Sequence, residues 1–291
     1  MGKKPLCIGL GEVLFDLLPD GAVLGGAPAN FARASCAAGA DGLAVSAVGD
    51  DRMGREARRQ LKARGLSACL PVVKDRRTGH VKVTFSGAGI PSYEFAEEPA
   101  YEAIPYTEEL AGLARAADIC CFGTMAQQGE MTRRTVTRFL EEMRPESVRV
   151  FDVNFRNGFD DREIVERSLV HATAVKCNEV ELPRLCRYAG IPESADTYWA
   201  YLETRFGIDC LMYTEGARQS CVYVHGGRSL LPAPSVPVID TVGAGDAFTA
   251  ACVVSLYLGK SLQEAHEKAV AMSAFVCSQQ GGMPDYSLFN F

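Results

Sequence analysis

The stretch that decides how the rest of the chain is interpreted runs from Asp240 to Phe248 and reads DTVGAGDAF. In it, Gly243 and Gly245 flank Ala244, and an apolar run follows, which predicts a buried helix that begins near residue 244. The first N–H groups of a helix have no partner within it and carry the positive end of its dipole. Glycines that let a ligand approach this backbone therefore predict an anion site suited to a phosphate.

Asp246 is the unexpected residue of this motif. A carboxylate in the same turn would repel a resting phosphate, yet it is well placed to accept a proton from an attacking hydroxyl group. The motif therefore indicates phosphoryl transfer. Taken alone, it also fits an ordinary helix N-terminus in which Asp246 faces the dipole and the glycines form a turn.

Composition narrows the classes of protein. The chain has 291 residues, of which 47% are hydrophobic and 23% charged, which predicts one large α/β domain, with or without a small appendage. The net charge is −6, and no Lys/Arg stripe is interleaved with aromatic residues, so no nucleic-acid partner is expected. The eleven cysteines include no CxxC and the four histidines no HExxH, which predicts reduced core thiols and no structural zinc.

The N-terminus enters a strand-like run directly, and no apolar stretch reaches the ~18–20 residues that cross a bilayer. We therefore expect a cytoplasmic protein without a membrane partner.

Helices and strands alternate from residue 107 onward. Periodicity predicts helices at 107–116, 130–143, 161–170, 179–189 and 195–206, with short strands at 118–123, 148–153, 173–177 and 209–214. A hairpin at 220–232 and helices at 244–258 and 261–279 complete the chain. This order predicts a mainly parallel sheet covered by helices on both faces.

Polar side chains follow the predicted strands at the points where they end. They are Thr124, then Asp152, Asn154 and Arg156, then Asn178 and Glu181, then Thr214 and Gly216, and finally the 240–246 loop. Ligands of such sheets bind at the carboxyl ends of the strands, so we expect these residues to lie together.

The first hundred residues have a different character. A buried strand at 5–10 is followed by an apolar run at 12–18 that contains Asp16, and then by Gly25-Gly26 ahead of a helix. The two glycines could let a polyol lie against bare backbone while Asn30 binds its hydroxyls; the alternative is a simple glycine turn. Segments 68–73, 79–86 and 90–96 suggest antiparallel strands that form, with 12–18, a small sheet acting as a lid.

With these motifs in order, nearly the whole chain resembles the ribokinase-like (PfkB) carbohydrate kinases. The matching segments are Gly25-Gly26 with Asn30, residues 48–54, Asn178 with Glu181, Thr214 with Gly216, and above all residues 240–246. Within the family the chain is most similar to bacterial fructokinases, through Gly11-Glu12 with Asp16, residues 122–127, residues 152–156 and residues 179–182.

The resemblance implies a single ribokinase-like domain over 1–291. It implies a three-layer α/β fold with a mainly parallel central sheet and a β-sheet lid formed by about 12–24 and 68–104. ATP would be the donor, with Mg²⁺ and, in many members, a stimulatory K⁺. The expected reaction transfers the γ-phosphate to a primary hydroxyl of a neutral sugar, fructose to fructose 6-phosphate. A homodimer through the lid is plausible because its edge would otherwise be exposed.

Alternatives remain at this stage. They are a kinase for ribose, 2-keto-3-deoxygluconate or a nucleoside, and a sugar- or nucleotide-binding regulator that has lost catalysis. The acidic lid residues Glu97 and Glu98 argue against an acidic sugar, unless they are simply solvated.

The resemblance also implies roles for residues. Asp246 would be the base, and the amides of Gly243, Ala244 and Gly245 would hold the charge on the γ-phosphate. Asp16, Gly25, Gly26 and Asn30 would bind sugar hydroxyls. Arg156 would touch substrate or phosphate, the alternative being a surface pair with Asp160 or Asp161.

On the nucleotide side, Asn178, Thr214, Gly216, Gly243 and Gly245 would bind ATP, with adenine contacts expected between 261 and 282. Glu181 would hold Mg²⁺ through water, the alternative being an exposed helix face, and Asp240 would bind the monovalent cation.

Overall fold

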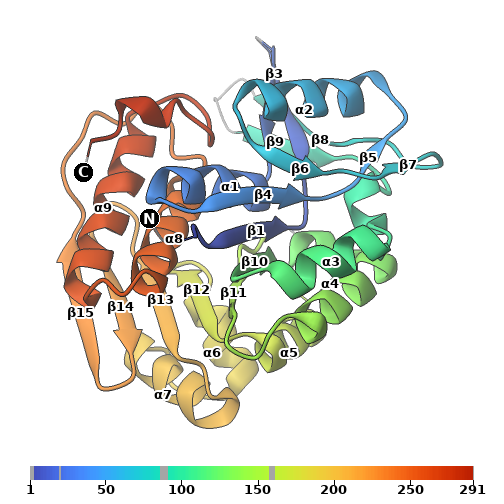
Figure 1. Ribbon diagram of the computed structural model, residues 1–291. Coiled ribbons are helices and arrows are strands. Elements are labelled where there is room, and N and C mark those ends of the chain that lie inside the picture. Colours follow the sequence, from blue (N-terminus) through green and yellow to red (C-terminus); the bar gives the residue numbers. More distant parts are fainter. Residues whose placement is uncertain (1–2, 20, 86–90, 157–160, 291) are drawn as a thin grey trace.

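The structure is a computed structural model that describes residues 3–19, 21–85, 91–156 and 161–290 (Figure 1). Its central sheet has nine strands in this described part of the chain. In spatial order they are β15 (Gly227–Pro232), β14 (Gln219–Val224), β13 (Cys210–Thr214), β12 (Ala174–Asn178), β11 (Val148–Asp152), β10 (Ile119–Gly123), β1 (Leu6–Leu10), β4 (Asp41–Val45) and β6 (Ser67–Cys69). Strands β13 to β6 are parallel, and the β14–β15 hairpin adds antiparallel strands at one edge.

Helices cover both faces of this sheet, because alternate residues of its strands point to opposite sides. Cys7 belongs to the core beneath α1 (Ala27–Ala38), α8 (Ala244–Tyr257) and α9 (Leu262–Cys277). Ile8, the next residue, belongs to the core on the opposite face. That face is covered by α3 (Glu108–Ala116), α4 (Glu130–Glu142), α5 (Arg162–His171), α6 (Leu182–Ala189) and α7 (Ala195–Phe206) (Figure 1). The predicted three-layer α/β architecture is confirmed.

The order of the strands creates a switch point. From β1, the chain first builds β4 and β6 on one side and then β10 to β13 on the other. The carboxyl ends of β1 and β10 are therefore neighbours whose following loops diverge, which leaves a crevice between them. Residues 11–12 follow β1 at this point, and Thr124 follows β10.

A separate four-stranded sheet has the order β3 (Gly21–Gly25), β2 (Leu14–Leu18), β8 (Gly79–Phe85) and β9 (Pro91–Phe95). It matches most of the predicted lid, but one part of the prediction is wrong. Segment 68–73 does not join this sheet: β6 pairs with β4 in the central sheet, and β7 (Val72–Val73) pairs with β5 (Val48–Gly49). Both pairings are parallel, and an alternating apolar pattern cannot tell which sheet a short edge strand joins. Residues Ala100–Ala103 form a 3-10 helix, η1.

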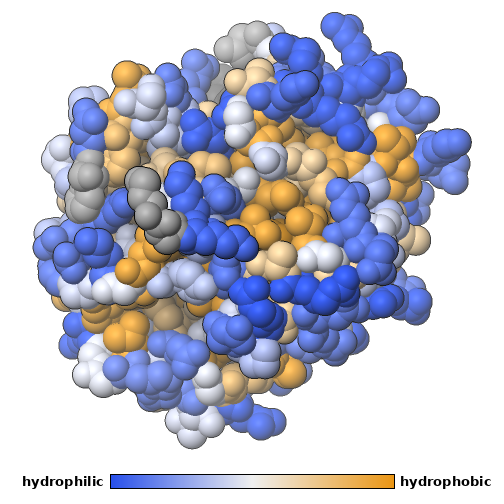
Figure 2. All heavy atoms as spheres, in the orientation of Figure 1, coloured by the Kyte–Doolittle hydropathy of each residue, from blue (hydrophilic) through white to orange (hydrophobic). Residues whose placement is uncertain are grey.

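Helix α2 (Arg52–Ala63) lies beside the small sheet and carries exposed cations that the sequence analysis did not single out: Arg52, Arg55, Arg58, Arg59 and Lys62. In Figure 2, blue, hydrophilic residues lie along the upper edge of the molecule, where Figure 1 shows α2, and an orange, hydrophobic area lies below them. Within the described ranges, no helix is both long and apolar enough to span a membrane. All eleven cysteines are free thiols, as predicted, and most are buried.

Candidate active site

The N-terminus of α8 is open to a ligand. Gly243 precedes the helix in the left-handed region at φ 80°, and among the described residues no side chain caps this end. A Cβ on Gly243 would lie 2.4 Å from Gly282 Cα, so the two backbones touch. Glycine is therefore required at 243 both by conformation and by space. The Ala244 amide also donates to Thr241 O at 3.3 Å, and the other amides of the first turn are left to bind an anion.

Asp246 lies in the first turn of the same helix and faces α1. Asn30 Nδ2 donates a hydrogen bond of 2.8 Å to Asp246 Oδ2. Asn30 is buried, and its own Oδ1 accepts no hydrogen bond from any described residue. Gly282 packs against the Asn30 amide, where a Cβ would come within 2.5 Å of Nδ2. The structure thus brings together Asp246 and Asn30, which are 216 positions apart in the sequence.

The pKa of Asp246 is raised by its surroundings. Burial and the nearby charge of Asp152 raise the pKa of this carboxyl from 3.8 to about 6, while the hydrogen bond from Asn30 and the charges of Lys176 and Arg156 oppose the rise. A carboxyl with such a pKa is ionised at neutral pH and is still able to hold a proton, which suits a base.

Lys176 lies beneath this site within β12. Its Nζ is 3.3 Å from Asp152 Oδ1, and the two side chains are only 7% and 5% exposed. Burial lowers the pKa of Lys176, but the carboxylates of Asp152, Glu181 and Asp246 more than compensate and hold it above its usual value. Lys176 is therefore a fixed positive charge between three acidic groups.

Glu12 adds a further buried carboxyl at the switch point. It lines a small cavity together with Thr124, Asp152 and Asn154. Burial raises the pKa of Glu12 to about 7, against the opposing charge of Arg156, and Asp246 raises it further. Glu12 Oε1 also accepts the Ala27 amide at 3.3 Å, which ties it to the start of α1.

The small sheet contributes Asp16 to the same region. The partner of Asp16 on β3 is Val23, and Gly25 lies two residues further along that strand, with the place of a Cβ 3.6 Å from Asp16 Oδ2. Burial raises the pKa of Asp16, Arg156 opposes this, and Asp240 adds to it. Gly26, at φ 115°, leaves no room for a side chain because a Cβ would lie 2.3 Å from Glu12 O.

Arg156 is exposed and lies within electrostatic reach of Glu12, Asp16 and Asp246. Of the two surface partners considered for it, Asp161 instead caps α5 by accepting the Glu163 amide, and residue 160 lies outside the described part of the chain. The surroundings of Arg156 thus favour the pocket.

Asn178 and Glu181 form a turn between β12 and α6 rather than two positions on one helix. Asn178 Oδ1 accepts the amides of Val180 and Glu181, and the carboxylate of Glu181 accepts those of Asn178 and Phe155. Glu181 is buried, so the exposed-face alternative is wrong for this residue.

Two further predicted residues lie beside this turn. Thr214 is paired with Asn178 across β12 and β13. Gly216 has φ 53°, and its missing Cβ would come 3.0 Å from Glu179 Oε1. Asn178, Glu181, Thr214 and Gly216 therefore lie together at the carboxyl ends of β12 and β13.

Asp240 connects the loop before α8 to the segment that follows α9. Its Oδ1 accepts the Val242 amide and its Oδ2 the Gly281 amide, both at 3.0 Å. Within the described ranges, no group of three or more His, Cys, Asp or Glu side chains could hold a metal ion.

Sequence analysis missed Lys176 and Gly282. Lys176 had a signal that was overlooked, since it is the one charged residue of the strand Ala174–Asn178, in a sheet predicted to be buried on both faces. Gly282 had no comparable signal, because its importance comes from contacts with Asn30 and Gly243, which are distant in sequence.

Comparisons with known proteins find similar chains over most of the sequence. A family model described as pfkB family carbohydrate kinase matches residues 21–287. A fructokinase of Klebsiella pneumoniae is 31% identical over 261 residues, which span 85% of this chain and 83% of the relative.

Two solved structures confirm the ribokinase-like fold. The fructokinase of Xylella fastidiosa with bound ATP superposes with a TM-score of 0.82 at 21% identity, covering 97% of this chain and 94% of that one. An E. coli protein described as ribokinase II in its apo form gives a TM-score of 0.83 at 20% identity, covering 97% and 95%.

Proposed function

The chain belongs to the pfkB family of carbohydrate kinases, and from this premise we propose that it transfers the γ-phosphate of ATP to a primary hydroxyl of a neutral sugar, fructose, giving fructose 6-phosphate. The observation that carries the proposal is the pairing of Asp246 with Asn30 at the uncapped N-terminus of α8. In this proposal Asp246 would act as the base beside amides that would bind a phosphate.

The sugar hydroxyl oxygen attacks the γ-phosphorus while its proton passes to an Asp246 carboxylate oxygen, and the bond from phosphorus to the β,γ-bridging oxygen breaks to release ADP. In a loose, in-line transition state the protein mainly positions groups and stabilises charge. The amides of Gly243, Ala244 and Gly245 would hold the charge on the γ-phosphate oxygens.

Asp246 is suited to this role by its surroundings. Asn30 fixes the orientation of the carboxylate through a single hydrogen bond to Oδ2, and the other oxygen remains for the hydroxyl proton. After transfer, a group with a pKa near 6 loses the proton again at neutral pH.

For the nucleotide, we propose that Asn178, Thr214, Gly216, Gly243 and Gly245 line the phosphate path, and that adenine contacts come from residues between 261 and 282. The K. pneumoniae and X. fastidiosa relatives are described as fructokinases, the latter with bound ATP, which supports this assignment.

The cations would be held mainly through the phosphates. Mg²⁺ keeps several waters and commonly binds one or two carboxylates besides substrate phosphates, which fits a site without a dedicated cluster of protein ligands. Glu181, whose oxygens are engaged by backbone amides, would hold the ion through water, and Asp240 would face the monovalent cation K⁺. The Mg²⁺ ion would neutralise charge on the transferred phosphate.

The acidic surroundings of the pocket support a neutral sugar. Glu12, Asp16 and Asp152 would repel a substrate carboxylate, and Glu97 and Glu98 are both exposed on the lid side. We propose that Asp16, Gly25, Gly26 and Asn30 bind sugar hydroxyls and that Arg156 neutralises the acids or the phosphate. A homodimer through the edge of the small sheet remains part of the proposal.

A substrate panel tests the proposal. Fructose, ribose and 2-keto-3-deoxygluconate are each supplied with MgATP, with and without K⁺, and sugar phosphate and ADP are quantified. We expect the highest kcat/KM with fructose. A preference for the acidic sugar would overturn the assignment of substrate, and a lack of ADP formation with any sugar would favour a binding protein.

A further inference from the structure

A buried ion pair lies directly behind the amide cradle, and the transfer described above does not use it. Lys176 comes from β12 and Asp152 from the end of β11, the neighbouring strand. Their charged atoms are 3.3 Å apart, and both side chains are at least nine-tenths buried. Removing two charges from water is costly, and an apolar pair of similar volume often serves stability as well or better. The location of the pair therefore requires another explanation.

The contact with Gly245 shows where the ammonium group lies. A Cβ on Gly245 would come 3.1 Å from Lys176 Nζ and 3.5 Å from Lys176 Cε. Gly245 is thus the point at which the lysine reaches the first turn of α8. The ammonium lies against the backbone of the cradle, and because it is buried, water screens its charge only weakly.

We propose that Lys176 is a positioning residue for the transfer: held by Asp152 behind Gly245, its ammonium adds fixed positive charge beneath the phosphate cradle and keeps Asp246 in the ionised, proton-accepting form. The inference rests on Asp246 being the base of the proposed reaction. Asp152 has the opposite effect, because its negative charge raises the pKa of Asp246 whereas the positive charge of Lys176 lowers it.

The other groups around Asp246 set the background against which this pair acts. From β1, α1, β10, β11, β12 and the C-terminal segment, the charged or titratable groups in electrostatic contact with it are Glu12, Cys121, Asp152, Arg156, Lys176 and Tyr286. The thiol of Cys121 and the phenol of Tyr286 have raised pKa values and are neutral at pH 7. The balance at Asp246 therefore lies between Glu12 and Asp152 on one side and Lys176 and Arg156 on the other.

The first experiment compares pH profiles. For wild type, Lys176→Met, Lys176→Arg and Asp152→Asn, kcat/KM for the best sugar acceptor is measured at saturating MgATP from pH 5 to 9. Loss of an opposite charge at this range shifts a carboxyl pKa upward by about 1–3 units, so the acidic limb should move to higher pH in Lys176→Met. It should move to lower pH in Asp152→Asn and stay near the wild-type position in Lys176→Arg.

The double variant Lys176→Met with Asp152→Asn separates charge from shape. Because the two single shifts have opposite signs, the acidic limb of the double variant should return towards the wild-type position. If all four variants lose activity by the same factor at every pH, with the limb unmoved, the pair is purely structural and the proposal is overturned.

The second experiment does not depend on turnover. The carboxyl carbon of Asp246 is titrated by NMR in protein labelled with ¹³C-aspartate, with Asp246→Asn used to assign the signal. Lys176→Met should raise the midpoint and Asp152→Asn should lower it. An unchanged midpoint would overturn the inference. If wild type phosphorylates no sugar while the midpoints still shift, the proposed function fails and the electrostatic coupling stands.

Discussion

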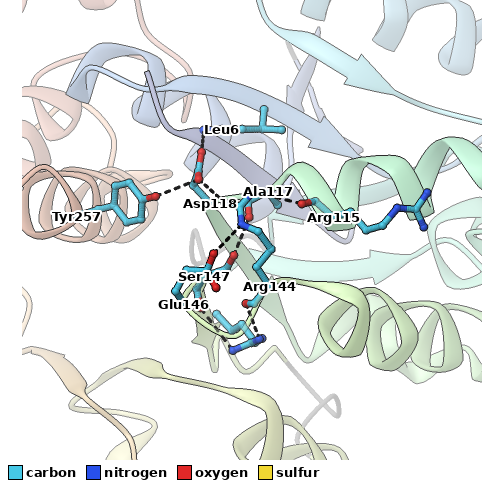
Figure 3. A network of polar contacts seen from close by, with 9 residues as sticks. Leu6, Arg115, Ala117, Asp118, Arg144, Glu146, Ser147 and Tyr257 are labelled. Atoms are coloured by element: carbon cyan, nitrogen blue, oxygen red, sulfur yellow. Dashed lines mark hydrogen bonds and ion pairs between the residues drawn. The ribbon is translucent and has the colours of Figure 1, made fainter. Parts of the chain in front are cut away.

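The two ends of α8 make opposite use of an aspartate. At its first turn Asp246 accepts a hydrogen bond from Asn30 of α1, and at its last turn Tyr257 donates a hydrogen bond of 3.0 Å to Asp118, the residue before β10 (Figure 3). The pKa of Asp246 is raised by burial and by a neighbouring carboxylate. The pKa of Asp118 is lowered, because hydrogen bonds from Leu6, Tyr257 and Arg144 outweigh the cost of its burial.

The C-terminal end of α8 is part of a network of hydrogen bonds around Asp118. Asp118 Oδ2 accepts the Leu6 amide at 2.7 Å, and Oδ1 accepts Arg144 Nη2 at 2.5 Å in addition to Tyr257. Arg144 also donates to the carbonyl of Arg115, and Ser147 to that of Ala117 (Figure 3). These bonds join the start of β1, the residue before β10 and the end of α8, so the network fixes the sheet and the helix together.

The comparison shows that the fold tolerates unsatisfied polar groups at the N-terminal end of α8. At the near end, Asn30 Oδ1 and Tyr286 Oη are buried without a hydrogen bond from the described residues, and several carboxyls crowd together. Unsatisfied polar groups in a native structure are the places where a function is expected, since each one lowers stability. The same helix is therefore anchored at one end and left available for a ligand at the other.

The largest effect should come from Asp246→Asn. The replacement keeps the volume and can still accept the hydrogen bond from Asn30 Nδ2, but it cannot take the sugar proton. We expect kcat to fall by about 10²–10⁴-fold. Steady-state assays check this, with circular dichroism to verify the fold. Retention of more than a tenth of wild-type kcat would contradict the role of Asp246 as base.

Asp118→Ala should show the reverse pattern. It leaves the Leu6 amide and Arg144 without their acceptor, so the free energy of unfolding should drop by about 1–3 kcal/mol in urea titrations. The kcat of the folded fraction should stay within a factor of about two, because the network does not contact the pocket.

A matched control is Glu146→Ala, which removes only the exposed partner of Arg144 at 3.1 Å and should change stability by about 0–1 kcal/mol. A loss of kcat in Asp118→Ala as large as that in Asp246→Asn would erase the distinction between the two ends.

The pH dependence of stability should differ in sign between the ends. Because the pKa of Asp246 is about 6 in the folded state and ordinarily 3.8, the folded state binds more protons between these values, and stability falls as pH rises through this window. Asp246→Asn removes this loss, so its Tm should match wild type near pH 4 and exceed it by roughly 2–5 °C above pH 6.5.

For Asp118 the folded pKa lies below 3.8, so its stabilisation is complete above that value and is lost as pH falls below it. The deficit of Asp118→Ala should therefore shrink under acid conditions. Thermal scans of both variants from pH 3 to 8 measure these trends, and parallel curves for the two variants would refute the assigned pKa directions.

Of the two variants that remove a hydrogen bond of Asp118, Tyr257→Phe should have the smaller effect. It removes one hydrogen bond to Asp118 from a side chain that is already 40% exposed, while Leu6 and Arg144 remain. We expect a loss of about 0.5–1.5 kcal/mol in the free energy of unfolding and no change in kcat. Urea denaturation of Tyr257→Phe and Asp118→Ala, measured under the same conditions, compares their free energies of unfolding. A loss larger than that of Asp118→Ala would mean that Tyr257 acts through contacts other than this network.

The N-terminal end of α8 could be predicted from the sequence because its residues are close together in the chain. Gly243, Gly245 and Asp246 are adjacent, and a helix start gives their geometry directly. The alternation of strands and helices likewise predicted the parallel sheet and the edge at which Thr214 and Asn178 meet.

What could not be predicted depends on long-range pairing. The role of Asp118 exists only through Leu6 and Tyr257, which are 112 and 139 positions away in the sequence. The same holds for β6, whose alternating residues fit either sheet until β4 provides its partner. The meaning of Lys176 needed the contact with Gly245, which no local pattern contains.

The most direct test of the account is a crystal structure of the protein with fructose and a non-hydrolysable ATP analogue. The account predicts the terminal phosphate within hydrogen-bonding distance of the amides of Gly243 to Gly245, and a primary sugar hydroxyl beside the Asp246 carboxylate. A phosphate bound elsewhere, or a sugar whose hydroxyls lie out of reach of Asp246, would contradict it.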